Sequence, residues 1–161
     1  MRKQSVTIAA GTAVLLWAAS AFAQMPNPYG PSITLDAARK AAAPALAEAQ
    51  KNNWRMAVAV VDISGDLVFF EKMDGTQAAS VAIAQDKARS SARFKRPTKA
   101  LQDGIAQGGG NLRLLAVKGL YPLEGGVPIV VDGKIIGAIG ASGVMANQDA
   151  EVAMAGAAAA K

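Results

Sequence analysis

Six cationic side chains gather in one short stretch and are the residues best suited to bind a ligand. Arginine can hold a carboxylate through paired hydrogen bonds, and lysine offers a point charge. The stretch could therefore bind an acidic ligand. It could instead be the solvated face of a helix on which Asp86 pairs with Arg89 or Arg93. The cationic residues are Lys87, Arg89, Arg93, Lys95, Arg96 and Lys99.

The chain contains no histidine and no cysteine, which excludes several kinds of chemistry. A Ser-His-Asp triad, a thiolate nucleophile, a disulfide and an ordinary zinc site are all impossible, and we predict no metal site. Asp74 or Glu124 could act as a base on a small organic acid whose carboxylate is held by Lys87 or Arg89. Neither carboxylate has an evident catalytic partner, so we assign no catalytic residue.

The first 23 residues have the order of a bacterial secretory signal peptide. Arg2 and Lys3 precede an uncharged apolar stretch at 6–19, and Ala21-Phe22-Ala23 forms an A-x-A cleavage pattern. An uncleaved anchor is the alternative, but a membrane span usually takes about 20 strongly apolar residues. We therefore predict cleavage after Ala23, a periplasmic or secreted location, and no membrane attachment afterwards.

The predicted mature chain has an extended lead-in at 24–32 and one domain at 33–161. The lead-in holds three prolines and a glycine, which favour extended chain. Loss of Arg2 and Lys3 lowers the basic count from 17 to 15 against 12 acidic residues, so the net charge becomes +3. So small an excess does not indicate a nucleic-acid partner.

The remaining elements predict a layered domain. Turn signals at Ser64-Gly65-Asp66 and Asp132-Gly133 lie between apolar runs and indicate two hairpins, hence an antiparallel sheet of about five strands covered by helices. The first strand is almost entirely apolar, which favours a central position, and Pro44 should kink or divide the first helix. Strands are predicted at 55–62, 67–73, 114–117, 127–131 and 134–142, and helices from Thr34, at 77–94, at 99–106 and at 148–160.

The last hairpin is unusually rich in glycine. Gly137, Gly140 and Gly143 recur every third residue, whereas a strand alternates every second residue, so they do not share one face. They could allow kinks or bulges under closely packed helices. They could also allow a flat ligand or another subunit to approach the backbone.

Several short pieces of the sequence, taken in order, form a set that covers about residues 33–157. They are AVAVVD at 57–62 followed by Gly65, MDG at 73–75, KARSS at 87–91, RPT at 96–98, GGVPI at 125–129, IGAIGASG at 136–143 and QDAEVAMAG at 148–156. Together these pieces resemble the GlcG/HbpS family of haem-binding proteins. The resemblance implies a single-domain α/β/α sandwich (α/β, of the α+β type) with a five-stranded antiparallel sheet, and oligomers that are often large.

The same resemblance implies a tetrapyrrole ligand and directs attention to particular side chains. Lys87 and Arg89 lie in the KARSS piece and become the expected partners of haem propionates. For the iron, Met73 or Tyr121 could be a ligand, and Ser90 offers only a weak hydroxyl. The alternative interpretation makes Met73 a core residue and Tyr121 a half-buried turn tyrosine.

Two further polar residues are expected around a pocket. Asp74 could line it or cap its own turn. Ser142 could be a strand-end hydroxyl, or a small anion could sit on the amides beside it.

Two functions are consistent with these features. The first is a secreted, homo-oligomeric protein that binds haem for storage, sensing or degradation. The second is a small enzyme or accessory protein acting on a small organic acid. A scaffold without a ligand is a third, plainer possibility.

Overall fold

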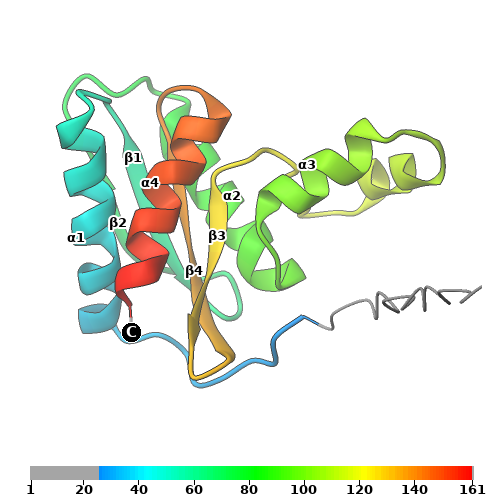
Figure 1. The fold of residues 1–161 in the computed structure, drawn as a ribbon, viewed down its shortest axis with the longest axis horizontal. Helices are drawn as coiled ribbons and strands as arrows, with labels where there is room; N and C mark the ends of the chain where they lie inside the picture. The colour runs from blue at the N-terminus through cyan, green and yellow to red at the C-terminus, as the bar shows by residue number, and fades with distance from the viewer. Residues whose placement is uncertain (1–25, 161) are drawn as a thin grey trace, which may run out of the picture.

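The computed structural model describes residues 26–160, and the predicted signal peptide at 1–23 lies outside them. The fold is of the α+β type (Figure 1). Its elements are α1 (Leu35–Lys51), β1 (Ala57–Asp62), β2 (Leu67–Lys72), α2 (Ser80–Phe94), α3 (Thr98–Ala106), the 3₁₀ helix η1 (Gly109–Ala116), β3 (Gly126–Val131), β4 (Lys134–Ser142) and α4 (Ala146–Ala159).

Two antiparallel hairpins meet in the middle of a four-stranded sheet of order β2-β1-β4-β3. Both hairpins were predicted, and β1 pairs with β4 from Ala57 opposite Ser142 to Asp62 opposite Gly137. The fifth strand, predicted near 114–117, is wrong because residues 109–116 form η1. Leucine and alanine dominate that stretch, and both favour helix over strand.

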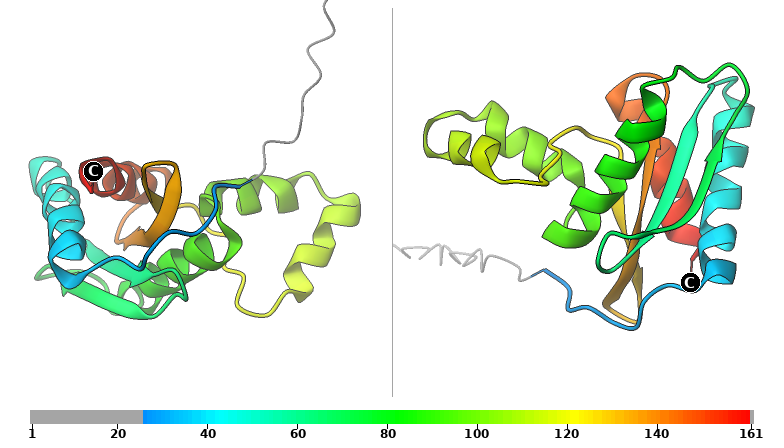
Figure 2. Two further views of the ribbon diagram at one scale, coloured as in Figure 1. Left: turned by 90° about the horizontal axis from the view of Figure 1, so that it is seen from below. Right: turned by 180° about the vertical axis from the view of Figure 1, so that it is seen from behind.

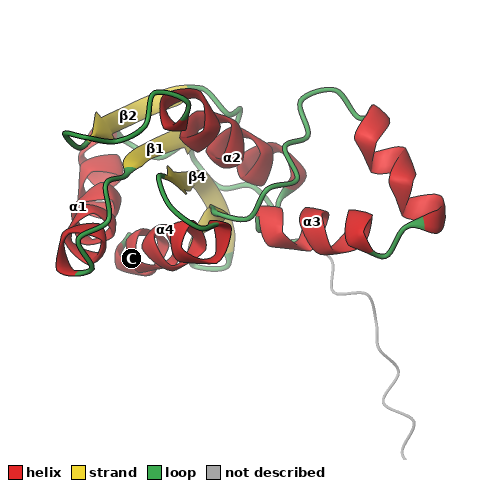
Figure 3. Cartoon of the chain, turned by 90° about the horizontal axis from the view of Figure 1, so that it is seen from above, coloured by secondary structure: helices red, strands yellow, loops and turns green. Residues whose placement is uncertain are grey.

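Helices cover both faces of the sheet, as Figures 2 and 3 show from several sides. Val58 and Val60 of β1 pack into the core that α1 and α4 share. Ala57, Ala59 and Val61 point the other way, against α2. Because successive side chains of β1 point to opposite faces of the sheet, this strand contributes to both cores. The predicted central position of β1 is confirmed.

Close packing explains the glycines of the last hairpin. A Cβ on Gly140 would overlap the carbonyl oxygen of Ala84 in α2, and one on Gly126 would overlap that of Lys87. On Gly137 it would meet the carbonyl oxygen of Val61 in the neighbouring strand. Backbone, rather than a ligand, comes close to these glycines, so the structure supports the interpretation based on packed elements.

The described residues of the lead-in, 26–32, are bound to the domain. Gly30 N donates to Ile135 O at 2.8 Å, and Ile33 N donates to Ile136 O at 2.7 Å. These contacts are at the start of β4, before Gly137. Gly137 is the first residue of β4 that pairs with β1, so β1 does not reach the residues that the lead-in contacts. The Tyr29 hydroxyl donates to Ala92 O at the end of α2, at 2.9 Å. The lead-in therefore takes up backbone groups that β1 leaves free.

The first helix begins where the sequence indicates and continues through its proline. The Thr34 hydroxyl accepts from Ala37 N at 3.3 Å and caps the helix at the start that the sequence predicts. Pro44 lies inside α1, yet the helix remains one element. No helix among residues 26–160 is long and apolar enough to cross a membrane.

The segment 98–123, which we call the arm, stands away from the sandwich (Figure 1). It consists of α3, η1 and the loop that returns toward β3. Its apolar side chains are unusually open to solvent, with Leu115 65% and Leu112 49% exposed. Val117 and Leu123 are also exposed. Exposed apolar residues grouped in one segment mark it as a candidate interaction surface.

Candidate functional site

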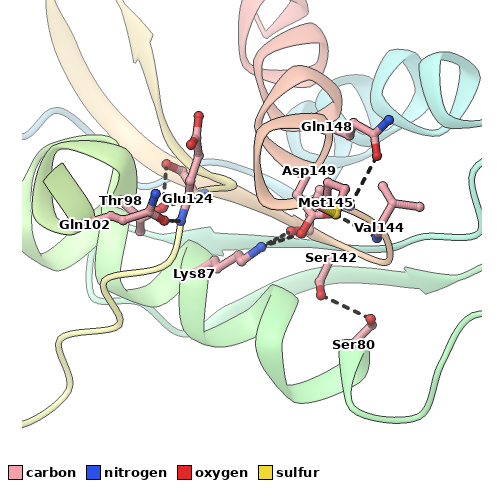
Figure 4. Close-up of polar contacts among 12 residues, drawn as sticks. Ser80, Lys87, Thr98, Gln102, Glu124, Ser142, Val144, Met145, Gln148 and Asp149 are labelled. Carbon is pink, nitrogen blue, oxygen red and sulfur yellow. Dashed lines mark hydrogen bonds and ion pairs between the residues drawn. The ribbon is translucent and has the colours of Figure 1, made fainter. Parts of the chain in front are cut away.

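Lys87, the expected propionate partner, is instead a buried structural residue. Its side chain has no exposed surface, and its Nζ lies 2.6 Å from Asp149 Oδ2 in α4. The same Nζ donates to Ala141 O at 3.2 Å. Figure 4 shows the lysine side chain extending from α2 to Asp149. A ligand carboxylate could reach this ammonium group only by displacing Asp149.

The Lys87–Asp149 pair joins three elements at the centre of the molecule. Asp149 Oδ1 accepts from Val144 N at 3.2 Å, which holds the loop before α4. Burial lowers the pKa of Lys87 and raises that of Asp149, and the attraction between the two groups opposes both changes. Gly125 passes so close that a Cβ there would lie 2.8 Å from Lys87 Nζ.

The arginines of α2 hold the first hairpin rather than a ligand. Arg89 Nε donates to Gly65 O at 3.1 Å, and its Nη1 pairs with Asp86 at 3.0 Å. Arg93 Nε donates to Ser64 O at 2.7 Å. For Arg89, the helix-face interpretation with Asp86 as its partner is the one the structure shows.

Three of the predicted site residues do meet, around a small cavity of about 270 Å³. Arg89 and Tyr121 line it, together with Asp86, Gly119 and Leu120. Ser90 is fully buried beneath, and its Oγ accepts from Tyr121 N at 3.0 Å. Burial raises the pKa of Tyr121, and the Asp86 carboxylate adds to this effect.

The other predicted residues lie elsewhere. Met73 is partly buried and packs against the α1–α4 core, while Asp74 is exposed in the turn that follows β2. Ser142 is buried and donates to Ser80 Oγ at 3.1 Å. None of the three lines the cavity of Arg89 and Tyr121. The described residues contain no cluster of side chains able to hold a metal ion.

A larger cavity, of about 430 Å³, runs along the free edge of β3 and is called the edge cavity below. Proline, valine and isoleucine side chains make most of its wall, and two cations enter it from the end of α2. Its lining residues are Pro26, Asn27, Lys95, Arg96, Pro97, Val127, Pro128, Val130 and Ile135. Apolar walls with a few charged groups are typical of small-molecule sites.

The end of α2 places the two cations. Lys95 adopts the left-handed conformation with φ 55°, which closes the helix, and Arg96 N donates to Ser91 O at 3.3 Å. Pro97 then prevents the helix from continuing. The ammonium of Lys95 lies 4.0 Å from the centre of the Tyr29 ring.

Within the described part of the chain, neither cation has a carboxylate partner. The ion pairs among residues 26–160 include neither Lys95 nor Arg96. Arg96 Nε donates to Phe94 O at 3.0 Å, and among residues 26–160 no hydrogen-bond acceptor pairs with Nη1 or Nη2 of the same guanidinium group, which leaves these atoms to bind an anion. The sequence indicated a cationic run, but Lys87 and Arg89 were the residues expected to bind the ligand. The position of Lys95 and Arg96 directly before Pro97 was the available signal for a helix end.

A third cavity, of about 390 Å³, lies beside the edge cavity and shares Pro97 and Val127 with it. Lys99, Glu124 and Met154 also line it. Lys99 Nζ pairs with Asp103 at 2.9 Å and lies 4.0 Å from Glu124. Glu124, considered above as a base, is therefore next to a lysine that already has a carboxylate partner.

A four-stranded antiparallel sheet between helical layers defines a small three-layer α+β domain. Residues 33–158 match the family described as haem degrading protein HbpS-like, and the chain belongs to this family. The resemblance predicted from the sequence pieces is thus confirmed. Protein GlcG of Escherichia coli K12 is 45% identical over 95 residues, which are 59% of this chain and 69% of GlcG.

Solved structures agree with this assignment. Protein ORFY of Klebsiella pneumoniae superposes with a TM-score of 0.77 at 27% identity, covering 81% of this chain and 92% of that one. HbpS gives 0.74 at 33% identity, covering 80% and 90%. A complex of PduOC with haem gives 0.72 at 25% identity, covering 80% and 94%.

Proposed function

We propose that this protein binds haem or a related acidic tetrapyrrole in the edge cavity. Two findings support the proposal beside the cavity itself: the family is described as haem degrading, and a structural relative forms a complex with haem. The observation that carries it is the combination, in one cavity, of an apolar wall with two cations that pair with no carboxylate among residues 26–160.

The lining residues match the two parts of such a ligand. Val127, Val130 and Ile135 would cover the apolar ring, and burial of apolar surface contributes about 25 cal/mol per Å². Lys95 and Arg96 would bind the propionates, with Arg96 able to use a paired geometry. Haem would supply its own redox chemistry, while the chain supplies binding and orientation.

A hemin titration of residues 24–161, followed by absorbance, tests this proposal. The variant Lys95→Ala with Arg96→Ala should bind hemin more weakly by about tenfold or more, since charge-assisted hydrogen bonds contribute roughly 1.5–3 kcal/mol each. The matched control is Arg39→Ala with Lys40→Ala, which removes the same two residue types from the exposed surface of α1. Unsaturable binding, equal in all three proteins, would mean nonspecific adsorption and would end the proposal.

We also propose that the protein is exported and cleaved after Ala23. The charged start, apolar stretch and A-x-A pattern of residues 1–23 support this. The intact mass of protein recovered from a periplasmic extract should correspond to a chain beginning at Gln24. A mass that includes residues 1–23 would contradict cleavage.

Finally, we propose that the protein forms homo-oligomers through the arm. The exposed leucines of η1 are the main support, since a monomer in water gains nothing from presenting them. The measurement that tests this proposal is given in the Discussion.

A further inference from the structure

We infer that the edge cavity recognises the ring and the carboxylates of a tetrapyrrole but not its metal ion. An iron-free porphyrin should then bind as tightly as haem. The inference rests on the proposed function and specifies the class of ligand. It follows from the donor atoms that the cavity lining contains.

The lining residues include none of the usual ligands of haem iron. Iron in haem proteins is bound by His, Cys, Met or Tyr, and the chain has no His or Cys at all. Among residues 26–160, those that line the edge cavity include no Met or Tyr. Its polar side chains are those of Asn27, Lys95 and Arg96. A charged lysine or arginine has no lone pair to offer a metal, and Lys95 is held as a cation over the Tyr29 ring.

The tyrosines and methionines within 26–160 are committed elsewhere or lie outside this cavity. The Tyr29 hydroxyl donates to Ala92 O, and burial raises the pKa of Tyr29, so its phenol stays protonated. Met56 is fully buried in the core, and Met73 packs against it. Met154 is exposed but lines the third cavity, on the other side of Pro97 and Val127.

Binding without the iron has a clear consequence for specificity. The free energy of binding would come from apolar contact with the ring and from the two cations, and both features are present in protoporphyrin IX. Hemin and protoporphyrin IX should therefore bind with dissociation constants within about threefold of each other. Esterifying the propionates should weaken binding of either compound, because an ester carries no charge for Lys95 and Arg96.

The test compares hemin, protoporphyrin IX and protoporphyrin IX dimethyl ester on residues 24–161. Quenching of Trp54, the single tryptophan of that chain, reports on every compound in the same way. We expect similar constants for hemin and protoporphyrin IX, an ester weaker by about tenfold or more, and the same loss for the Lys95→Ala, Arg96→Ala variant. The Arg39→Ala, Lys40→Ala variant should keep the original constants.

Other outcomes separate this inference from the proposed function. If hemin binds more tightly than protoporphyrin IX by about tenfold or more, the iron is recognised and the inference is wrong, while haem binding stands. The variants Met154→Leu and Met25→Leu would then identify the ligand, since Met25 precedes a lining residue and lies outside the described part of the chain. If no compound saturates the protein, the proposed function itself fails.

Discussion

The ammonium group of Lys87 and the carboxylate of Asp149 are both removed from water, 2.6 Å apart. Taking two charges from water costs several kcal/mol for each, and their attraction repays this only when the geometry is good. The pair is therefore tolerated in the core only when both partners are present. Either residue alone would be an unpaired charge in the core.

This requirement gives a prediction at the residue scale. Lys87→Met should destabilise the protein by about 3–5 kcal/mol, because it leaves Asp149 buried without its partner. The double variant Lys87→Met with Asp149→Asn should be closer to the original protein, since the amide oxygen can still accept from Val144 N. Urea unfolding followed by circular dichroism measures both. A double variant less stable than Lys87→Met would contradict the expected coupling.

The Lys87→Met variant should also depend on pH. Burial raises the pKa of Asp149, and removal of the lysine removes the interactions that lower it. In the folded variant the Asp149 carboxyl therefore keeps its proton to a higher pH than in the unfolded chain. The stability of the variant is greatest at low pH and falls as this carboxyl ionises. The destabilisation relative to the original protein should be smaller at about pH 5 than at about pH 8. Equal destabilisation at both values would show that the protonation of Asp149 does not change across this range.

At the scale of elements, α2 lies on the sheet at glycine positions. Gly140→Ala should destabilise the protein by about 1–3 kcal/mol or more, because its Cβ would overlap the backbone of Ala84 and lie 2.6 Å from Ala88 N. Gly110→Ala is the control, since its Cβ would meet only Arg113 Nη1, at 3.9 Å. Thermal unfolding of the two variants should therefore differ clearly. Similar losses in both would mean that α2 can move away from the sheet.

Turn residues and apolar patterns predicted most of these helices and strands. The wrong predictions concern residues whose environment is set by contacts with distant parts of the chain. Turns at Gly65 and at Asp132-Gly133 have a backbone requirement that is visible in the sequence. The segment 114–117 was assigned to the sheet from its apolar content, but in the arm the same side chains are exposed. Lys87 has the residue type of a surface cation, and only the fold brings Asp149, 62 positions away, to its side. The cations of the edge cavity depend likewise on the position where α2 ends.

At the scale of the whole molecule, the arm should hold the subunits together. Leu112→Asp with Leu115→Asp places charges on the most open side chains of η1 and should convert an oligomer to a monomer. Light scattering coupled to size-exclusion chromatography gives the mass directly. Leu35→Asp, at an equally open leucine of α1, is the control and should leave the mass unchanged. An arm variant that keeps its assembly would place the interface elsewhere.

The central ladder between β1 and β4 also bears on when the chain can fold. It joins Ala57 to Ser142 and Asp62 to Gly137, so the sheet cannot close until residues near the C-terminus are available. Contacts between distant parts of a chain form slowly, because a long loop must close first. During synthesis the first hairpin therefore lacks its partner strand until β4 has been made. Such a delay would suit the export proposed above, in which the chain passes through a translocation channel before the sheet is complete.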